Sequence, residues 1–276
     1  MLKQRLITAL VLLAILLPLL FHDASEPFMG FSLLMVSAGA WEWGRLNGYA
    51  HRTSVAMGVL FAVILAVLWI VWGVHYSVWV WVFPSMLWIL GGAWLLRNGV
   101  ACWAQFPRLI RLGSGLLALA FAWMAMAQAR TVGVNFLLST FFLVWAADVF
   151  AYFGGRAFGK RKLAPTISPG KSWAGVYTGA LGVLIMAGLW VWSDRQFNLD
   201  SPSLYSQLFA ANPIAALLAL FGLTAMSVVG DLVESLVKRS AGFKDSSNLL
   251  PGHGGVLDRV DALLPVLPLV MLLTQI

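Results

Sequence analysis

Charged residues of both signs gather between Gly230 and Asp261, although only 11% of this 276-residue chain is charged. Five of its 11 acidic residues lie in that stretch, and apolar sequence flanks it on both sides. Charges are costly beside a membrane core, so such a cluster indicates a function. Carboxylates bind hard divalent cations such as Mg²⁺, and lysine and arginine bind phosphate groups. Together these residue types favour transfer at a phosphorus atom.

The acids of this stretch are spaced as neighbours on helices. Asp231, Glu234 and Lys238 are three and four residues apart, which places them on one helical face. Asp258 and Asp261 would lie one turn apart if a last helix begins there. Glu234 is more simply explained as an ion-pair partner of Lys238. Asp231 is harder to dismiss, because an acid at the end of an apolar span is rare without a function.

His253 lies in a predicted tight turn, where backbone can approach a ligand closely. The residues that bracket it are Pro251, Gly252, Gly254 and Gly255. Basic residues surround this turn in the sequence, and they could bind phosphate or could simply be the positive flanks of membrane helices. These are Lys238, Arg239, Lys244 and Arg259.

A second polar stretch runs from residue 154 to residue 173. Just before it, Asp148 lies within an apolar segment, with Tyr152 one turn later. Near its end, Ser168, Lys171 and Ser172 precede another apolar segment, and amides at a helix start with one lysine form a plausible phosphate cradle. The spacing of a P-loop is absent. A plain connector, or a basic run that binds anionic lipid, would explain this stretch equally well.

The composition shows which elements must position these residues. Hydrophobic residues make up 61% of the chain, against roughly 45–50% in soluble domains. This predicts an all-α, polytopic membrane protein, because helices satisfy their backbone polar groups within lipid. We expect about nine membrane-spanning segments, at Leu6–Phe21, Phe28–Trp43, Ser54–Trp72, Val78–Leu96, Gly113–Ala129, Val134–Phe153, Ala174–Trp192, Pro213–Val233 and Ala262–Ile276.

The basic residues fix the expected orientation. With the N-terminus in the cytoplasm, 16 of the 18 lysines and arginines fall on the cytoplasmic side. The net charge of +7 then reflects membrane topology, and we expect no nucleic-acid partner. The first apolar segment lacks a signal-peptide cleavage site, which favours an uncleaved anchor in a bacterial inner membrane with the active site on the cytoplasmic face.

The chain divides into two predicted regions. Residues 1–132 would form N-terminal transmembrane helices, and residues 133–276 a catalytic transmembrane region. Two cytoplasmic loops of the second region, 154–173 and 234–261, would carry the site. The single cysteine, Cys102, excludes an intrachain disulfide, and no zinc-ligand spacing is present.

The segment from Ser235 to Asp261 resembles the signature of the phosphatidate cytidylyltransferases, also called CDP-diacylglycerol synthases. It reads SLVKR, SAGF, KD, SSNLLPG, HGG, VL and DRVD, in the order of that signature. The stretch ADVFAYFGGRAFGKRKLAPTISPGKSWAG, which begins at Ala147, resembles a second block of the family. Val149 and Phe150 depart from the small residues expected there.

The resemblance implies an enzyme that makes CDP-diacylglycerol and pyrophosphate from CTP and phosphatidic acid. It also implies Mg²⁺, often in a two-metal centre, and a homodimer in the lipid bilayer. By motif matching, the metal ligands are Asp231, Asp258 and Asp261. The resemblance implies phosphate contacts for Lys238, Arg239, Lys244 and Arg259, and a turn-shaping or phosphate-contacting function for His253. It implies substrate contacts for Ser168, Lys171 and Ser172, and the polar positions Asp148 and Tyr152 join this set.

Three alternatives compete with this interpretation. A transporter could use intramembrane acids such as Asp148 and Asp231 as a cation path. However, the polar residues gather at one face, whereas a carrier places them near the midplane. A related enzyme that acts on another lipid phosphate or another nucleotide has the same spacing. A purely structural scaffold would leave the acids unexplained.

Overall fold

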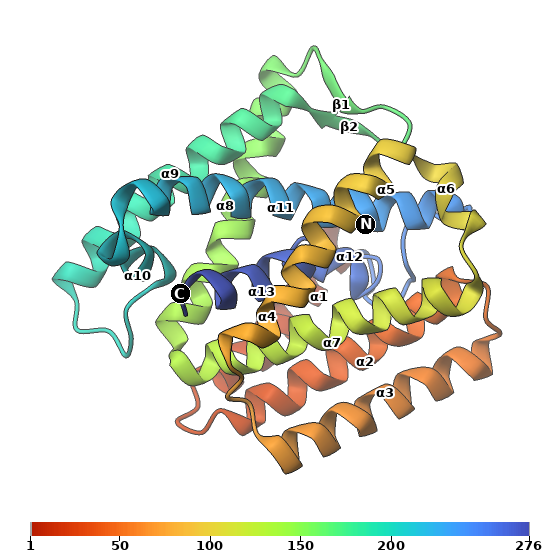
Figure 1. Cartoon of the computed structure of the whole chain (residues 1–276), viewed down its shortest axis with the longest axis horizontal. Helices are drawn as coiled ribbons and strands as arrows, with labels where there is room; N and C mark the ends of the chain where they lie inside the picture. The colour runs from red at the N-terminus through yellow and green to blue at the C-terminus, as the bar shows by residue number, and fades with distance from the viewer. Residues whose placement is uncertain (1, 276) are drawn as a thin grey trace.

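The computed structural model describes residues 2–275, which are mostly helical (Figure 1). Ile276, the predicted end of the last span, lies outside the described residues. The first half of the chain forms α1 (Leu2–Leu20), α2 (Glu26–Leu46), α3 (His51–Trp72), α4 (Val78–Met86), a π-helical segment η1 (Leu87–Gly92), α5 (Ala93–Asn98), α6 (Val100–Gln105) and α7 (Arg108–Val132). The second half forms α8 (Val134–Phe158), β1 (Lys162–Ala164), β2 (Ser168–Ser172), α9 (Trp173–Gln196), α10 (Leu204–Ala211), α11 (Pro213–Ser240), α12 (Leu257–Val260) and α13 (Leu263–Leu273).

Within the described residues, six helices are long and apolar enough to cross a membrane. They are α3, the continuous helix Val78–Asn98, α7, α8, α9 and α11. The other three predicted spans correspond to α1, α2 and α13. The last has 11 residues, which rise about 16 Å, roughly half the hydrocarbon thickness of a bilayer. For these three segments, membrane crossing stays a prediction.

Helix α13 lies at the centre of the molecule, where α4, α7, α8 and α11 surround it (Figure 1). Every residue from Leu264 to Leu272 is buried. A helix that is apolar on all sides is expected to be buried on all sides. The final apolar segment therefore forms the core around which the longer helices pack.

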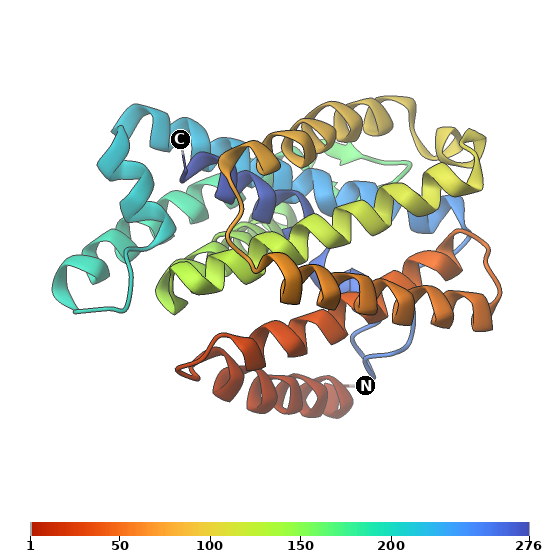
Figure 2. The same ribbon diagram turned by 60° about the horizontal axis from the view of Figure 1, so that its bottom comes forward.

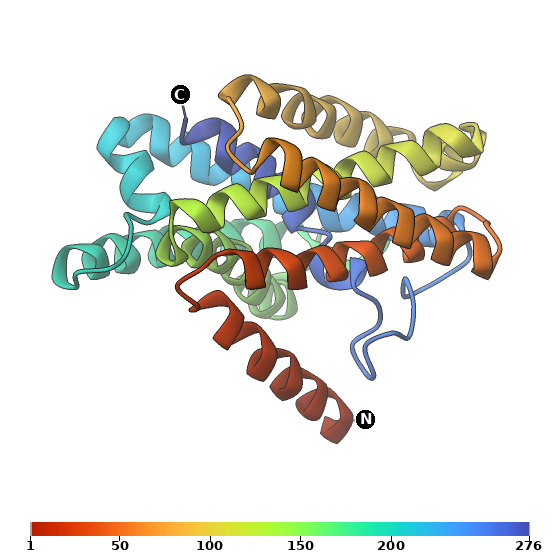
Figure 3. The same cartoon turned by 90° about the horizontal axis from the view of Figure 1, so that it is seen from below.

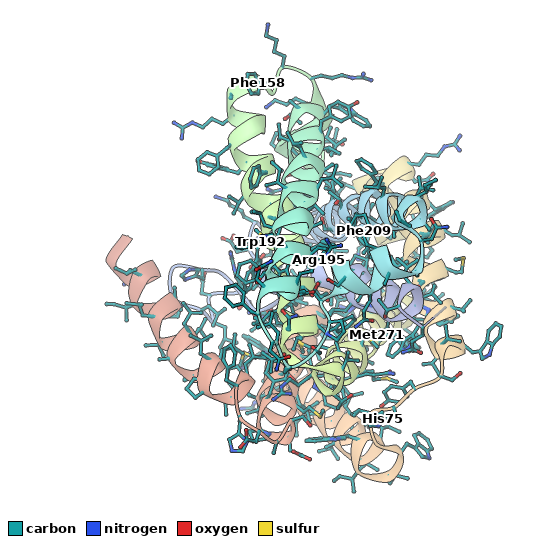
Figure 4. All side chains as sticks on the ribbon, turned by 90° about the vertical axis from the view of Figure 1, so that its left-hand side faces the viewer. His75, Phe158, Trp192, Arg195, Phe209 and Met271 are labelled. Atoms are coloured by element: carbon teal, nitrogen blue, oxygen red, sulfur yellow. The ribbon has the colours of Figure 1, made fainter. Side chains whose placement is uncertain are left out.

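Helix α1 diverges from the other helices and is mostly exposed (Figure 3). Helices α2, α3 and α7 lie side by side (Figure 2). Helices α8 and α9 pack as a hairpin that projects from one side of the molecule, with Phe158 at its tip and Trp192 and Arg195 at its other end (Figure 4).

Side-chain caps set the ends of several helices. The Ser172 hydroxyl accepts a hydrogen bond from Gly175 N at the start of α9. The Asn212 side chain caps α11 in the same way, with Pro213 at the first helical position. These caps fix the residues at which α9 and α11 begin.

The structure corrects two details of the predicted all-α fold. A two-stranded antiparallel sheet, β1–β2, occupies part of the predicted loop 154–173. In addition, α8 continues to Phe158 and α11 to Ser240, so the first residues of both predicted loops are helical. Gly154 lies within α8 where α9 packs closely against it. A larger residue would not fit there, because a Cβ at Gly154 would lie 2.0 Å from the Thr178 hydroxyl. Hydropathy marks where an apolar segment ends, and the helix continues beyond it.

Gly115 lets α7 approach α2, because a Cβ there would lie 1.9 Å from the indole ring of Trp43. We therefore expect Gly115→Ala to destabilise the protein by about 1–3 kcal/mol, the usual cost of overpacking. Gly113→Ala, on the same helix, is the control, because no atom lies within 4 Å of a Cβ there. The thermal unfolding midpoint in detergent should fall for Gly115→Ala only. Equal midpoints for both variants would contradict this packing.

Candidate functional site

A cleft of about 630 Å³ lies between α8, β2, α9 and α11. This volume is within the usual range for a small-molecule site. Five of the predicted site residues line it, although they come from separate parts of the sequence: Asp148, Tyr152, Lys171, Ser172 and Asp231. The structure thus joins the two polar stretches of the sequence into one site. Ser168 lies on β2 but not on the cleft wall.

The two sides of the cleft are joined by an ion pair. Lys171 Nζ lies 2.7 Å from Asp231 Oδ2, which connects β2 to α11. The two side chains are 23% and 30% exposed, so both remain accessible from the cleft. An accessible ammonium and an accessible carboxylate can bind a phosphate and a cation, respectively.

Sequence analysis missed two basic residues of the cleft, Arg156 and Lys162. From the sequence, both residues are explained as positive flanks of membrane helices, and Lys162 also as part of a basic run that could bind anionic lipid. The spacing of Asp148, Tyr152 and Arg156 at intervals of four residues could have indicated one shared helical face. Arg156, Lys162 and Lys171 give the cleft three cationic side chains, which would complement a polyphosphate.

A second cluster surrounds Lys238, whose side chain is 11% exposed. Its ammonium forms ion pairs with Glu234, which confirms the predicted pairing, and with Asp258 Oδ1 at 2.5 Å. Both carboxylates are more buried than the lysine. Charges at this depth need such partners, because an unpaired buried charge is strongly unfavourable.

The second oxygen of Asp258 holds the loop that precedes α12. Asp258 Oδ2 accepts hydrogen bonds from Ser246 N at 2.9 Å, Ser246 Oγ at 2.9 Å and Gly255 N at 2.8 Å. Burial disfavours the charge, but the bonds from Lys238, Gly255 and Ser246 outweigh it and lower the pKa of Asp258. Asp258 is therefore ionised and fully engaged by protein donors.

Glu42 of α2 is a further residue that sequence analysis missed. It is fully buried, and its carboxylate accepts hydrogen bonds from the loop between α11 and α12 and from the first residues after it. An acid within an apolar segment was the signal that could have identified it, as it identified Asp148.

The predicted glycine turn around His253 is present. Gly252 and Gly254 have φ of +77° and +82°, a conformation that favours glycine. Arg259 Nε donates to the carbonyl oxygen of His253 at 3.0 Å and so braces the turn. Gly255 allows a close approach, because a Cβ there would lie 2.3 Å from a Glu42 oxygen.

Arg239 and Lys244 lie outside both clusters. Both are exposed, and Arg239 donates to the carbonyl oxygen of Phe243 at 3.3 Å. They lie on the surface near the end of α11, where a charged ligand could reach them.

Asp261 lies near Asp231, in contrast to Asp258. Gly230 lets the two segments approach, because a Cβ there would lie 2.4 Å from the Asp261 carbonyl oxygen. Burial, and then the charge of Asp231, raise the pKa of Asp261 to about 7. The described residues contain no group of three or more acidic, His or Cys side chains arranged for a metal ion. Two carboxylates with substrate phosphates can nevertheless hold Mg²⁺, and of the three predicted ligands, Asp231 and Asp261 lie close enough for their charges to interact.

The model of the cytidylyltransferase family matches residues 3–276, which is nearly the whole chain. The chain belongs to this family. It is similar to the phosphatidate cytidylyltransferase of Pseudomonas aeruginosa PAO1, with 40% identity over 97% of this chain and 95% of the relative. It is also similar to the phosphatidate cytidylyltransferase of Haemophilus influenzae Rd, with 35% identity over 97% and 96% of the two chains. The protein of that name from Brucella abortus biovar 1 is 34% identical, over 98% and 92%.

Family membership confirms the resemblance of the segment Ser235–Asp261. In this cytidylyltransferase, that segment is the last part of α11, the loop anchored by Glu42 and Asp258, and α12. Its charged residues comprise a buried set around Lys238, Asp261 near Asp231, and an exposed set. The family signature therefore contains residues that hold the loop as well as residues that are free to bind a ligand.

The buried ion pairs of Lys238 with Glu234 and Asp258 predict that this lysine contributes to the stability of the protein. Lys238→Met leaves Glu234 and Asp258 without their cation, and we expect a loss of about 3–5 kcal/mol in unfolding free energy. Adding Glu234→Gln should restore part of that loss, because it removes a buried carboxyl group that has lost its cation. Unfolding in detergent measures both variants. A stable Lys238→Met protein would contradict the pairing.

Proposed function

We propose that this chain is a phosphatidate cytidylyltransferase, which transfers the cytidylyl group of CTP to phosphatidic acid. An oxygen of the lipid phosphate attacks the α-phosphorus of CTP, the bond to the β-phosphate breaks, and pyrophosphate leaves. The observation that carries this proposal is the nearly full-length similarity to three relatives of that name. The cleft supports it by offering cations and carboxylates on one accessible surface.

The cleft is the proposed CTP site. Lys171, Arg156 and Lys162 line it and would neutralise the triphosphate as charge redistributes during transfer. Ser172 caps α9 and thereby fixes the position of the neighbouring Lys171. Ser168 would contribute from the same strand, outside the cleft wall.

Mg²⁺ is the proposed cofactor, and it would neutralise the phosphates and orient them for in-line attack. Asp231 and Asp261 would hold it, as two carboxylates close to the cleft. That Asp258 is a metal ligand, and that a second ion completes a two-metal centre, remain predictions. The oxygens of Asp258 are engaged by Lys238, Ser246 and Gly255.

The remaining motif residues would act on phosphate groups. Arg239, Lys244 and Arg259 are exposed and can approach a phosphate from the surface. His253 would shape the turn or touch a phosphate. No general base is needed, because a phosphate is already ionised and nucleophilic near neutral pH.

The lipid would reach the site from the bilayer. Tyr152 lines the cleft and is 60% exposed, and its neighbour Phe153 is 64% exposed. An apolar, exposed surface at the cleft edge suits a substrate whose acyl chains stay in the membrane. A structure with the cleft sealed from the bilayer by a partner subunit or by lipid-excluding helices would rule this route out.

We further propose that the protein spans a bacterial inner membrane about nine times, with its N-terminus and its site in the cytoplasm. The distribution of basic residues supports this orientation. The resemblance also implies a homodimer. The bundle then presents the proposed site where soluble CTP and membrane-bound phosphatidic acid meet.

The activity is tested with labelled CTP, phosphatidic acid and Mg²⁺ on the purified protein in detergent. We expect CDP-diacylglycerol and pyrophosphate in equal amounts, and no product when a chelator removes Mg²⁺. Asp231→Asn should lower kcat by about 10²-fold or more, because a ligand carboxylate is lost and with it metal stabilisation of the transition state. Asp23→Asn, an exposed acid outside the cleft, is the control and should keep native kcat. A folded native protein without product would refute the proposed function, and an active Asp231→Asn would refute the metal assignment.

The orientation is tested with single cysteines in a Cys102→Ala background. Asp23 and Asn248 are both exposed, and they lie in segments predicted on opposite sides of the membrane. In spheroplasts, a membrane-impermeant maleimide should label Asp23→Cys directly and Asn248→Cys only after permeabilisation. The reverse pattern would invert the topology.

A further inference from the structure

Glu42 has an unusual set of partners for an acid within an apolar helix. Its Oε1 accepts hydrogen bonds from Ser247 Oγ at 2.5 Å and Val256 N at 2.9 Å. Its Oε2 accepts from Leu257 N at 2.8 Å and lies 3.1 Å from Ser246 Oγ. All four donors belong to residues more than 200 positions away in the sequence.

This arrangement requires a carboxylate. Each oxygen of Glu42 faces one backbone N–H, from Val256 or from Leu257. A glutamine would place its NH₂ group against one of these N–H groups in either orientation of the amide. A backbone N–H left unpaired at a fully buried position is unfavourable, so the loop would have to shift.

Ser246 connects Glu42 to the charged residues of the family signature. Its hydroxyl lies 3.1 Å from Glu42 Oε2 and 2.9 Å from Asp258 Oδ2, and its N–H also donates to Asp258. Asp258 in turn pairs with Lys238. A continuous set of short contacts thus runs from α2 through the loop to α11.

We propose that Glu42 is a positioning residue for the transfer reaction. It holds the loop between α11 and α12, and the backbone of residues 256 and 257, so that Asp258 keeps its contact with Lys238 of α11 and the following Asp261 keeps its place near Asp231. This inference rests on the proposed cytidylyltransferase activity for its kinetic consequence. Its structural part, the anchoring of the loop, can be measured independently of activity.

The kinetic test is Glu42→Gln in the CTP and phosphatidic acid assay. Displacement of reacting groups by about 1 Å can cost about 10²-fold in rate, and we expect kcat to fall by about that factor. The KM for CTP should change much less, because Lys171, Arg156 and Lys162 do not depend on the loop. Glu42→Asp keeps the charge on a shorter side chain and should recover part of kcat.

A matched control is available at the other end of the bundle. Asp194 of α9 also accepts four hydrogen bonds, from Asn135, from Ser206 and two from Ser203. Its contact with Ser206 places it beside α10, and α10 lies away from α12 (Figure 1). Asp194→Asn should lower the unfolding midpoint but keep native kcat. Equal losses of kcat in Glu42→Gln and Asp194→Asn would overturn the inference, because both would then reflect general destabilisation.

Amide hydrogen exchange provides the readout that does not need activity. In Glu42→Gln, residues 243–257 should exchange faster than in the native protein, whereas Asp194→Asn should leave their exchange unchanged. Unaltered exchange in Glu42→Gln, or native kcat, overturns the inference. If the native protein makes no product, the proposed function fails, while the exchange result still decides whether Glu42 anchors the loop.

A milder variant covers the case in which Glu42→Gln does not fold. Ser247→Ala removes one of the hydrogen bonds that Glu42 accepts and should lower kcat less, with faster exchange confined to the same loop. Combining Glu42→Asp with Ser246→Ala should cost less than the product of the single effects, because both act through Asp258. Independent, multiplicative losses would contradict the connection through Ser246.

Discussion

The need to satisfy buried carboxylates organises the end of the molecule that carries the site. Glu42, Glu234 and Asp258 are removed from solvent, and each buried carboxyl group needs a cation or several hydrogen-bond donors as partners. Lys238 forms ion pairs with Glu234 and Asp258, and the loop before α12 donates hydrogen bonds to Glu42. Helices α2 and α11 and this loop are consequently held together by charge and not only by apolar packing.

The same principle separates residues that hold the fold from residues that are free to bind a ligand. The ion pairs of Lys238 with Glu234 and Asp258 are buried. A ligand that displaced one partner would leave a charge without its counter-ion in an apolar environment. The Lys171–Asp231 pair faces a cleft and is partly solvated, so its partners can be exchanged at a small cost. A substrate phosphate or a cation is therefore expected to compete at Lys171 and Asp231 first. The Lys238 pairs and the Lys171–Asp231 pair thus differ in accessibility, although all of these residues look equally charged in the sequence.

Much of this arrangement follows from the sequence, because acids are rare in apolar segments. That argument identified Asp148 and Asp231, and the structure places both in one cleft with Lys171. It could not foresee that Asp258 and Asp261 separate. The Asp258 carboxylate accepts hydrogen bonds from the loop, whereas Asp261 lies near Asp231. The short β1–β2 sheet was also unforeseen, because strand pairing depends on contacts that local spacing does not encode.

Glu42 shows why the unforeseen part matters. Hydropathy treats it as one charge in a predicted span, and only the folded chain reveals that its partners begin more than 200 residues later. The division proposed from sequence, into residues 1–132 and 133–276, describes where the signature motifs lie. The hydrogen bonds of Glu42 cross that division and terminate on the loop that carries the signature. The second region therefore depends on α2 for the shape of its own loop, and the two regions form one structural unit at the site.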